Sequence, residues 1–232
     1  MAVAGGSRAD HASAQVPDFE WVEVSYGSAT KVDVAVFKPE GYSDSGTHPL
    51  ILALPWGAGT PGLALGMVDA YWNREAPRRG YVVIAPAIVG SSLANEATEF
   101  LPALFSWLDE NVSYDPERAV VVGASNGGRG VFHVLAAEPD RFAAAIAMPG
   151  SYSGPTERLA PFAGKPVWLM VGELDQRWRA STEATLATLE AAGIPSRANV
   201  INGQGHVLRV DDRTLMDWLD EVLRSSPLPV SR

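Results

Sequence analysis

The chain has 232 residues, of which 18 are basic and 27 acidic, and its formal net charge of −9 at pH 7 argues against binding to nucleic acid or to an anionic membrane surface. A hydrophobic fraction of 47% is ordinary for a globular protein and predicts neither disorder nor a membrane span. Because the sequence contains no cysteine, disulfides, thiolate catalysis and cysteine-based metal sites are excluded, whereas the cellular compartment stays open.

The first 16 residues are rich in Ala, Gly and Ser and contain no apolar core of signal-peptide length. We expect them to form a flexible N-terminal segment, followed by a single domain over residues 17–232 that no repeat, linker or change of composition divides. The segment fits either a cytoplasmic protein or the remnant of a processed leader, so both localisations remain.

Two stretches of alternating residues, 19–26 and 31–38, predict an antiparallel hairpin at one edge of a sheet. Six short apolar runs follow and are typical of buried parallel strands: 50–54, 81–85, 119–122, 143–148, 167–171 and 197–201. Helical patterns fill most of the gaps between these runs. We expect helices from Asn95 to about residue 111, from around Ser181 to Gly193, and from Asp211 or Asp212 to about residue 224. This order predicts an α/β fold of about eight mostly parallel strands, with helices on both faces and an antiparallel N-terminal edge.

The sequence Gly123-Ala124-Ser125-Asn126-Gly127 directly follows the strand expected at 119–122. A sharp turn from strand to helix at this point would expose the Ser125 hydroxyl at the end of the sheet, and the flanking glycines would relieve the crowding. The same five residues also suit an ordinary turn, so other parts of the chain have to decide between a nucleophile and a turn residue.

A serine hydroxyl becomes nucleophilic when an imidazole takes its proton and a carboxylate orients that imidazole. Of the four histidines, only His206 follows an apolar run at the carboxyl end of an expected strand. Glu173 and Asp175 both follow the run 167–171; Asp175 is favoured for its reach, and Glu173 remains the alternative. The chain order Ser125, Asp175, His206 is the one expected of an α/β-hydrolase.

Acyl transfer also needs hydrogen-bond donors for the oxyanion of the tetrahedral intermediate. One donor is expected from the backbone N–H of Asn126, at the start of a helix. The second is expected from the glycine-rich loop 54–62, where Ala58 is our first choice and the N–H groups of Gly57 and Trp56 are alternatives. A plain flexible loop is the competing interpretation of this segment.

Residues 123–150 resemble the esterase branch of the α/β-hydrolase family that includes feruloyl and acetyl xylan esterases and polyhydroxybutyrate depolymerases. In that branch Pro-Asp-Arg-Phe-Ala leads into the next strand, as residues 139–143 do here. The resemblance covers residues 19–224 and implies Ser125, Asp175 and His206 as the catalytic triad. The chain departs from the family in having Trp56-Gly57 where many relatives have His-Gly.

Only residues 149–165 separate the sixth and seventh expected strands, which is too short for a helical cap domain and predicts a fairly open site. Candidate substrate-binding residues near this site are Trp56, Gly57, Tyr152 and Trp178, although each aromatic side chain could instead pack a loop onto the domain. The substrate would be a small-molecule or polymeric ester. The histidines lack metal-ligand spacing and no cofactor fingerprint is recognisable, so we expect neither a metal nor a cofactor.

The leading hypothesis is therefore a serine carboxylic-ester hydrolase that acts through an acyl-enzyme. One alternative is a peptidase or amidase on the same fold, because Ser-Asn-Gly-Gly also resembles the elbow of prolyl-oligopeptidase relatives. Another is a non-hydrolytic lyase or binding protein, which Trp56 in the oxyanion loop favours. The oligomeric state is not predictable from these residues.

Overall fold

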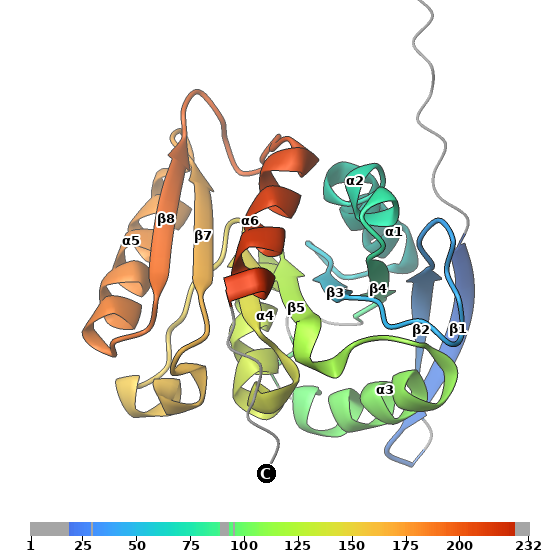
Figure 1. Cartoon of the computed structure of the whole chain (residues 1–232). Helices are drawn as coiled ribbons and strands as arrows, with labels where there is room; N and C mark the ends of the chain where they lie inside the picture. Colours follow the sequence, from blue (N-terminus) through green and yellow to red (C-terminus); the bar gives the residue numbers. More distant parts are fainter. Residues whose placement is uncertain (1–18, 29, 89–92, 95, 226–232) are drawn as a thin grey trace, which may run out of the picture.

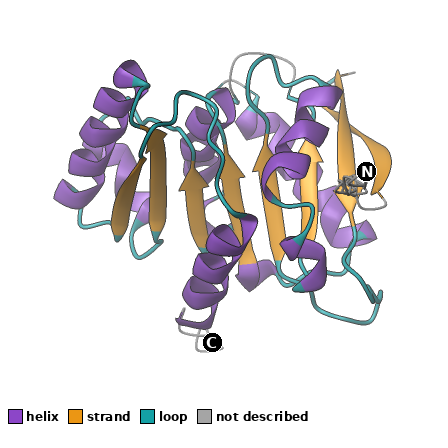
Figure 2. Cartoon of the chain, turned by 90° about the horizontal axis from the view of Figure 1, so that it is seen from above, coloured by secondary structure: helices purple, strands orange, loops and turns teal. Residues whose placement is uncertain are grey.

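The computed structural model describes residues 19–225 except 29, 89–92 and 95, and these residues build one sheet with helices on both faces (Figures 1 and 2). The strands are β1 (Phe19–Tyr26), β2 (Thr30–Phe37), β3 (Leu50–Leu54), β4 (Val82–Pro86), β5 (Ala119–Gly123), β6 (Ala144–Ala147), β7 (Val167–Gly172) and β8 (Ser196–Ile201). Their order across the sheet is β1-β2-β4-β3-β5-β6-β7-β8. β2 pairs antiparallel with both β1 and β4, whereas the later neighbours are parallel, which confirms the predicted sheet.

The helices of the described residues divide between the two faces of the sheet (Figure 2). One face is covered by α3 (Ala97–Asn111), α4 (Asn126–Ala137) and α5 (Gln176–Ala191). The other face is covered by α1 (Pro61–Tyr71), α2 (Glu75–Arg78) and α6 (Asp212–Ser225). Short 3-10 segments connect them at η1 (Pro116–Arg118), η2 (Pro139–Arg141) and η3 (Thr156–Phe162).

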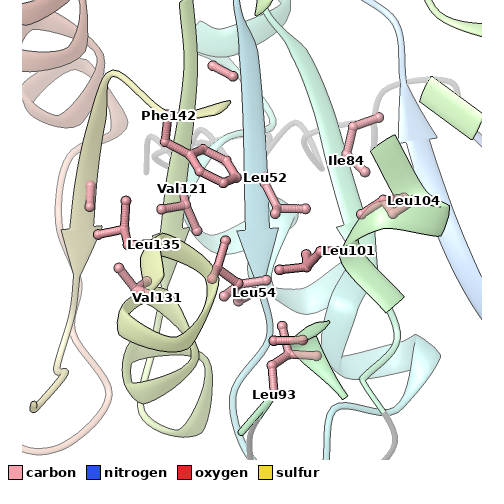
Figure 3. Close-up of a cluster of buried hydrophobic side chains, with 14 of the residues drawn as sticks. Leu52, Leu54, Ile84, Leu93, Leu101, Leu104, Val121, Val131, Leu135 and Phe142 are labelled. Carbon is pink, nitrogen blue, oxygen red and sulfur yellow. The ribbon is translucent and has the colours of Figure 1, made fainter. Parts of the chain in front are cut away.

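The central strands read as continuous apolar runs because both of their faces are buried. In β3, Leu52 and Leu54 point toward the side of α3 and α4, where Figure 3 shows them among Leu101 and Val131. The alternate residues Ile51 and Ala53 belong to the cluster on the opposite face. The sheet is thus packed between two hydrophobic clusters, one on each face, which fix the positions of its strand ends.

Two helix starts refine the sequence-based expectation. The helix predicted from around Ser181 to Gly193 is present, but its predicted start was wrong: α5 begins at Gln176, because the side chain of Asp175 accepts a hydrogen bond from the backbone N–H of Trp178 and caps the helix. At α6, Asp211 accepts a hydrogen bond from the backbone N–H of Arg213 at 3.1 Å, as an N-cap does. Asn95, the expected cap of α3, lies outside the described residues.

The carboxyl ends of β3, β5, β7 and β8 meet at one edge of the sheet because these strands run in the same direction. Ligands of open α/β sheets bind at this edge. Residues 149–165 are all described and contain η3 as their one helical segment, so they hold no cap domain over the edge. Among the described helices, none has the length and apolar character needed to cross a membrane.

The predicted flexible segment, residues 1–16, lies outside the described residues. A single domain over residues 17–232 stays a prediction.

Candidate active site

Ser125 occupies the sharp turn between β5 and α4. It is the one non-glycine residue of the described chain with a positive φ (φ 57°, ψ −112°). A Cβ atom on Gly123 would lie 2.3 Å from the carbonyl oxygen of Gly127, and one on Gly127 would lie 2.2 Å from that of Leu54, so both positions require glycine. The strained backbone and its two glycines form a sharp strand-to-helix turn of the shape that a nucleophile elbow requires, and the role of Ser125 as nucleophile stays a prediction.

His206 joins Ser125 to Asp175. Its Nε2 lies 2.8 Å from Ser125 Oγ, and its Nδ1 lies 2.5 Å from Asp175 Oδ2. With the proton on Nδ1, the imidazole donates to the carboxylate and keeps Nε2 free to accept the serine proton. The Asp175 side chain is 13% exposed and the His206 side chain 43%, so the carboxylate is shielded while the imidazole stays accessible from solvent.

The structure separates the two candidate acids. Asp175 lies between β7 and α5, where one carboxylate oxygen accepts from the Trp178 N–H and the other faces His206. Glu173 instead accepts a hydrogen bond from the backbone N–H of Gly203 at 2.8 Å and holds the turn after β8. Asp175 is therefore the carboxylate that the fold brings to His206.

Two side chains that the sequence analysis missed hold the loop that carries His206. Gln204 donates from Nε2 to the carbonyl of Arg209 at 3.0 Å and accepts from the N–H of Arg209 at 2.6 Å, which closes the loop on itself. The Tyr71 hydroxyl donates to the carbonyl of Leu208 at 2.8 Å. Burial raises the pKa of Tyr71 to about 12, so this hydroxyl keeps its proton at neutral pH.

The loop after β3 is tied directly to the elbow. Asn126 donates from Nδ2 to the carbonyl of Gly57 at 2.7 Å, and its Oδ1 accepts from Arg129 Nη1 at 3.3 Å. Because a trans peptide points its C=O and N–H in opposite directions, the Ala58 N–H points away from the Asn126 side chain. Asn126 is the first residue of α4, so its own N–H has no partner within the helix. Their roles as oxyanion donors stay predictions.

A cavity of about 160 Å³ opens beside Ser125. It is walled mostly by apolar side chains, and its lining residues are Trp56, Gly57, Tyr71, Ala124, Ser125, Met148, Pro149, His206 and Val207. Two of the predicted substrate-binding residues, Trp56 and Gly57, thus belong to the cavity, whereas Ala58 lies one residue beyond its lining.

The other two candidates lie outside this lining. The Tyr152 ring packs against Phe132 and Phe162, with centroids 5.7 and 6.4 Å apart, and its hydroxyl donates to the Pro155 carbonyl. These contacts anchor the segment after β6, and the predicted contact of Tyr152 with substrate stays a prediction. The Trp178 ring flanks the His206 ring at a centroid distance of 5.3 Å, and the Arg129 guanidinium lies 4.6 Å from the same indole.

In the part of the chain that the structure describes, no three His, Cys, Asp or Glu side chains gather as ligands for a metal ion.

Comparison with known proteins agrees with this architecture. Residues 66–231 match a family described as "Putative esterase". No curated protein sequence matches the chain. A solved thermostable esterase is 19% identical with a TM-score of 0.71, over 88% of this chain and 62% of that one, so the chain spans less than two thirds of its length.

Two further solved structures are similar along nearly their whole length. A ferulic acid esterase is 16% identical with a TM-score of 0.71, over 89% of this chain and 97% of that chain. An acetyl xylan esterase from Aspergillus awamori is 16% identical with a TM-score of 0.68, over 88% and 99%. The predicted resemblance to an esterase branch of this fold is thereby confirmed at the level of family and fold. The chain belongs to the esterase family and has the α/β-hydrolase fold.

Proposed function

We propose that the chain is a serine carboxylic-ester hydrolase whose triad is Ser125, His206 and Asp175. The observation that carries the proposal is the pair of contacts made by His206, 2.8 Å to the serine oxygen and 2.5 Å to the carboxylate. These contacts lie at the edge of the sheet where this fold binds its ligands. Membership of the esterase family supports the same chemistry.

In the first half of the reaction, Ser125 Oγ attacks the ester carbonyl carbon while His206 Nε2 takes the serine proton. The carbonyl oxygen becomes an oxyanion, which accepts hydrogen bonds from the N–H of Asn126 and from the N–H of Ala58. The C–O bond to the alcohol then breaks, and His206 passes its proton to the departing oxygen. An acyl group remains on Ser125.

In the second half, His206 takes a proton from a water molecule that attacks the acyl carbon. The resulting tetrahedral intermediate collapses, the bond to Ser125 Oγ breaks, and His206 returns the proton to that oxygen. The carboxylic acid leaves and the enzyme is regenerated. Asp175 accepts the hydrogen bond from Nδ1 throughout and stabilises the imidazolium in both halves. The substrates are small-molecule or polymeric carboxylic esters.

Hydrolysis of p-nitrophenyl acetate by the wild type, Ser125→Ala and Ser153→Ala tests the proposal. Ser153 is an exposed serine outside the cavity lining and serves as the matched control. Ser125→Ala is expected to lower kcat by roughly a thousandfold or more, with an unchanged circular dichroism spectrum, and Ser153→Ala to behave as wild type. Undiminished hydrolysis by Ser125→Ala would overturn the proposal. A matching p-nitroanilide should be cleaved far more slowly than the ester, and faster cleavage of the amide would favour a peptidase.

A further inference from the structure

Trp56 forms a wall of the Ser125 cavity, and a glycine on the neighbouring helix leaves room for it. A Cβ atom on Gly66 of α1 would lie 3.3 Å from Trp56 Cζ2, which is closer than ordinary van der Waals contact. The indole also meets the Tyr71 ring edge-on, at a centroid distance of 6.3 Å and an angle of 86°. The side chain packs against the buried cluster on this face of the sheet. The indole position is therefore determined by α1 and not by the loop alone.

The cavity offers few polar partners besides the reacting groups. Its side chains from Ala124, Met148, Pro149 and Val207 are apolar, and the hydroxyl of Tyr71 is engaged with the Leu208 carbonyl. A hydroxyl-rich group such as a sugar would lose its hydrogen bonds to water here without replacement, whereas an apolar group loses none. The cavity thus selects an apolar part of the substrate.

The cavity volume limits the size of that part. It measures about 160 Å³. An engineered apolar cavity of about 150 Å³ in another protein stays dry and binds one benzene ring. The space beside Ser125 consequently holds about one aromatic ring or an aliphatic chain of similar volume.

His206 decides which side of the ester enters the cavity. The leaving alcohol has to face Nε2, which returns its proton, and the His206 side chain is 43% exposed, so the alcohol has a path to solvent. The apolar space beside Ser125, which His206 borders on one side, is then left for the acyl group. We propose that the cavity is the acyl pocket and that Trp56 is a specificity-determining residue that limits it to acyl groups of about one aromatic ring. This inference rests on the proposed function, because an acyl pocket requires Ser125 to be the nucleophile.

The test is a series of p-nitrophenyl esters, from acetate through butanoate, hexanoate and octanoate to dodecanoate, together with benzoate. We measure kcat/KM for the wild type, Trp56→Ala, Trp56→Phe and Gly66→Ala. The matched control is Trp21→Ala, because Trp21 is a 41% exposed tryptophan on the edge strand β1. For the wild type, we expect the hexanoate and benzoate esters to be good substrates. Its kcat/KM for the octanoate and dodecanoate esters should be lower than that for the hexanoate ester by roughly tenfold or more.

Trp56→Ala is expected to shift the preferred acyl group to longer chains and to raise the octanoate-to-acetate ratio by roughly tenfold. The octanoate-to-acetate ratio of Trp56→Phe should lie between those of the wild type and Trp56→Ala. Because this substitution is milder, it tests the same prediction if the alanine variant does not fold. Gly66→Ala places a methyl group 3.3 Å from Trp56 Cζ2, so we expect it to displace the indole slightly and to change the hexanoate-to-acetate ratio although residue 66 is outside the lining. Trp21→Ala should keep the wild-type profile.

A second series, acetate esters of methanol to octanol, tests whether the acyl side was chosen correctly. An unchanged acyl profile in Trp56→Phe and Trp56→Ala, or a change confined to the alcohol series, would overturn the inference. Failure of the proposed function looks different, because then no ester in either series is hydrolysed through Ser125 and Ser125→Ala matches the wild type.

Discussion

The carboxylate of Asp175 lies 2.5 Å from His206 Nδ1 through one oxygen and caps helix α5 through the other. One residue therefore both starts a helix and orients the imidazole. Since the cap fixes the carboxylate at the rigid start of α5, the carboxylate can orient the imidazole toward Ser125.

Asp175→Asn should remove the negative charge that stabilises the imidazolium and orients its tautomer. We expect kcat to fall by about ten-thousandfold, as the equivalent change does in chymotrypsin-type proteases, with KM little changed. Glu173→Gln is the matched control, because it retains an oxygen that can accept from the Gly203 N–H. Both kcat and KM are measured with p-nitrophenyl acetate. Loss of activity in Glu173→Gln with retention in Asp175→Asn would reverse the assignment of the acid.

The Asn126 side chain is expected to position the glycine-rich loop 54–62, the expected source of one oxyanion donor, through its hydrogen bond to the Gly57 carbonyl. Asn126→Ala removes that donor and should lower kcat by roughly tenfold at nearly constant KM, which corresponds to about one hydrogen bond. Asn126→Asp should behave similarly, because it still accepts from Arg129 but cannot donate to Gly57. Full activity in Asn126→Asp would show that the bond to Gly57 has no part in catalysis.

Gln204 is expected to position His206 by closing the loop onto the backbone of Arg209. Gln204→Ala loses both hydrogen bonds and Gln204→Glu loses the donated one, so kcat should fall in the order wild type, Glu, Ala. The two hydrogen bonds together stabilise the closed loop by about 2 kcal/mol. If all of this free energy serves to orient His206, kcat of Gln204→Ala should be lower than that of the wild type by roughly thirtyfold. The rate of labelling by a fluorophosphonate gives an independent measure of serine reactivity. Equal labelling rates in all three proteins would contradict this role.

Tyr71 should make the stability of the protein depend on alkaline pH. Burial raises its pKa from 10.0 to about 12, so the unfolded chain loses this proton at lower pH than the folded protein does. The resulting stabilisation is fully present below about pH 10 and is lost as the pH rises toward 12.

Melting temperatures of the wild type and Tyr71→Phe are compared between pH 8 and pH 11.5. Wild type should lose stability more steeply above pH 10, whereas at pH 8 the variant should be less stable by about 1 kcal/mol because it lacks the bond to the Leu208 carbonyl. Parallel curves across the whole range would contradict a buried, protonated Tyr71.

The features that were predictable from the sequence are those with a local physical cause. The strands β3 and β5 are buried on both faces, so their apolar runs are continuous and visible. The elbow was recognisable because its crowding demands glycine at 123 and 127, which leaves a spaced pattern in the chain. Asp175 and His206 followed from their positions just after strands at one edge of the sheet.

Other features depend on contacts between distant residues, and no local pattern reports them. The Tyr71 hydroxyl bonds to a carbonyl 137 residues later. The beginning of α5 was placed too late because its first turns face solvent, and its buried positions start only at Thr182. Tyr152 was assigned to the site from its place on a loop, and no local pattern reports that Phe132 and Phe162 pack against its ring.

The most direct test of the central claim is mass spectrometry of the protein after treatment with a fluorophosphonate. The account predicts one covalent adduct, on Ser125 of the wild type, and no adduct on a folded Ser125→Ala variant. No adduct on the folded wild type, or an adduct that persists in Ser125→Ala, would contradict the activation of Ser125 by His206 and Asp175.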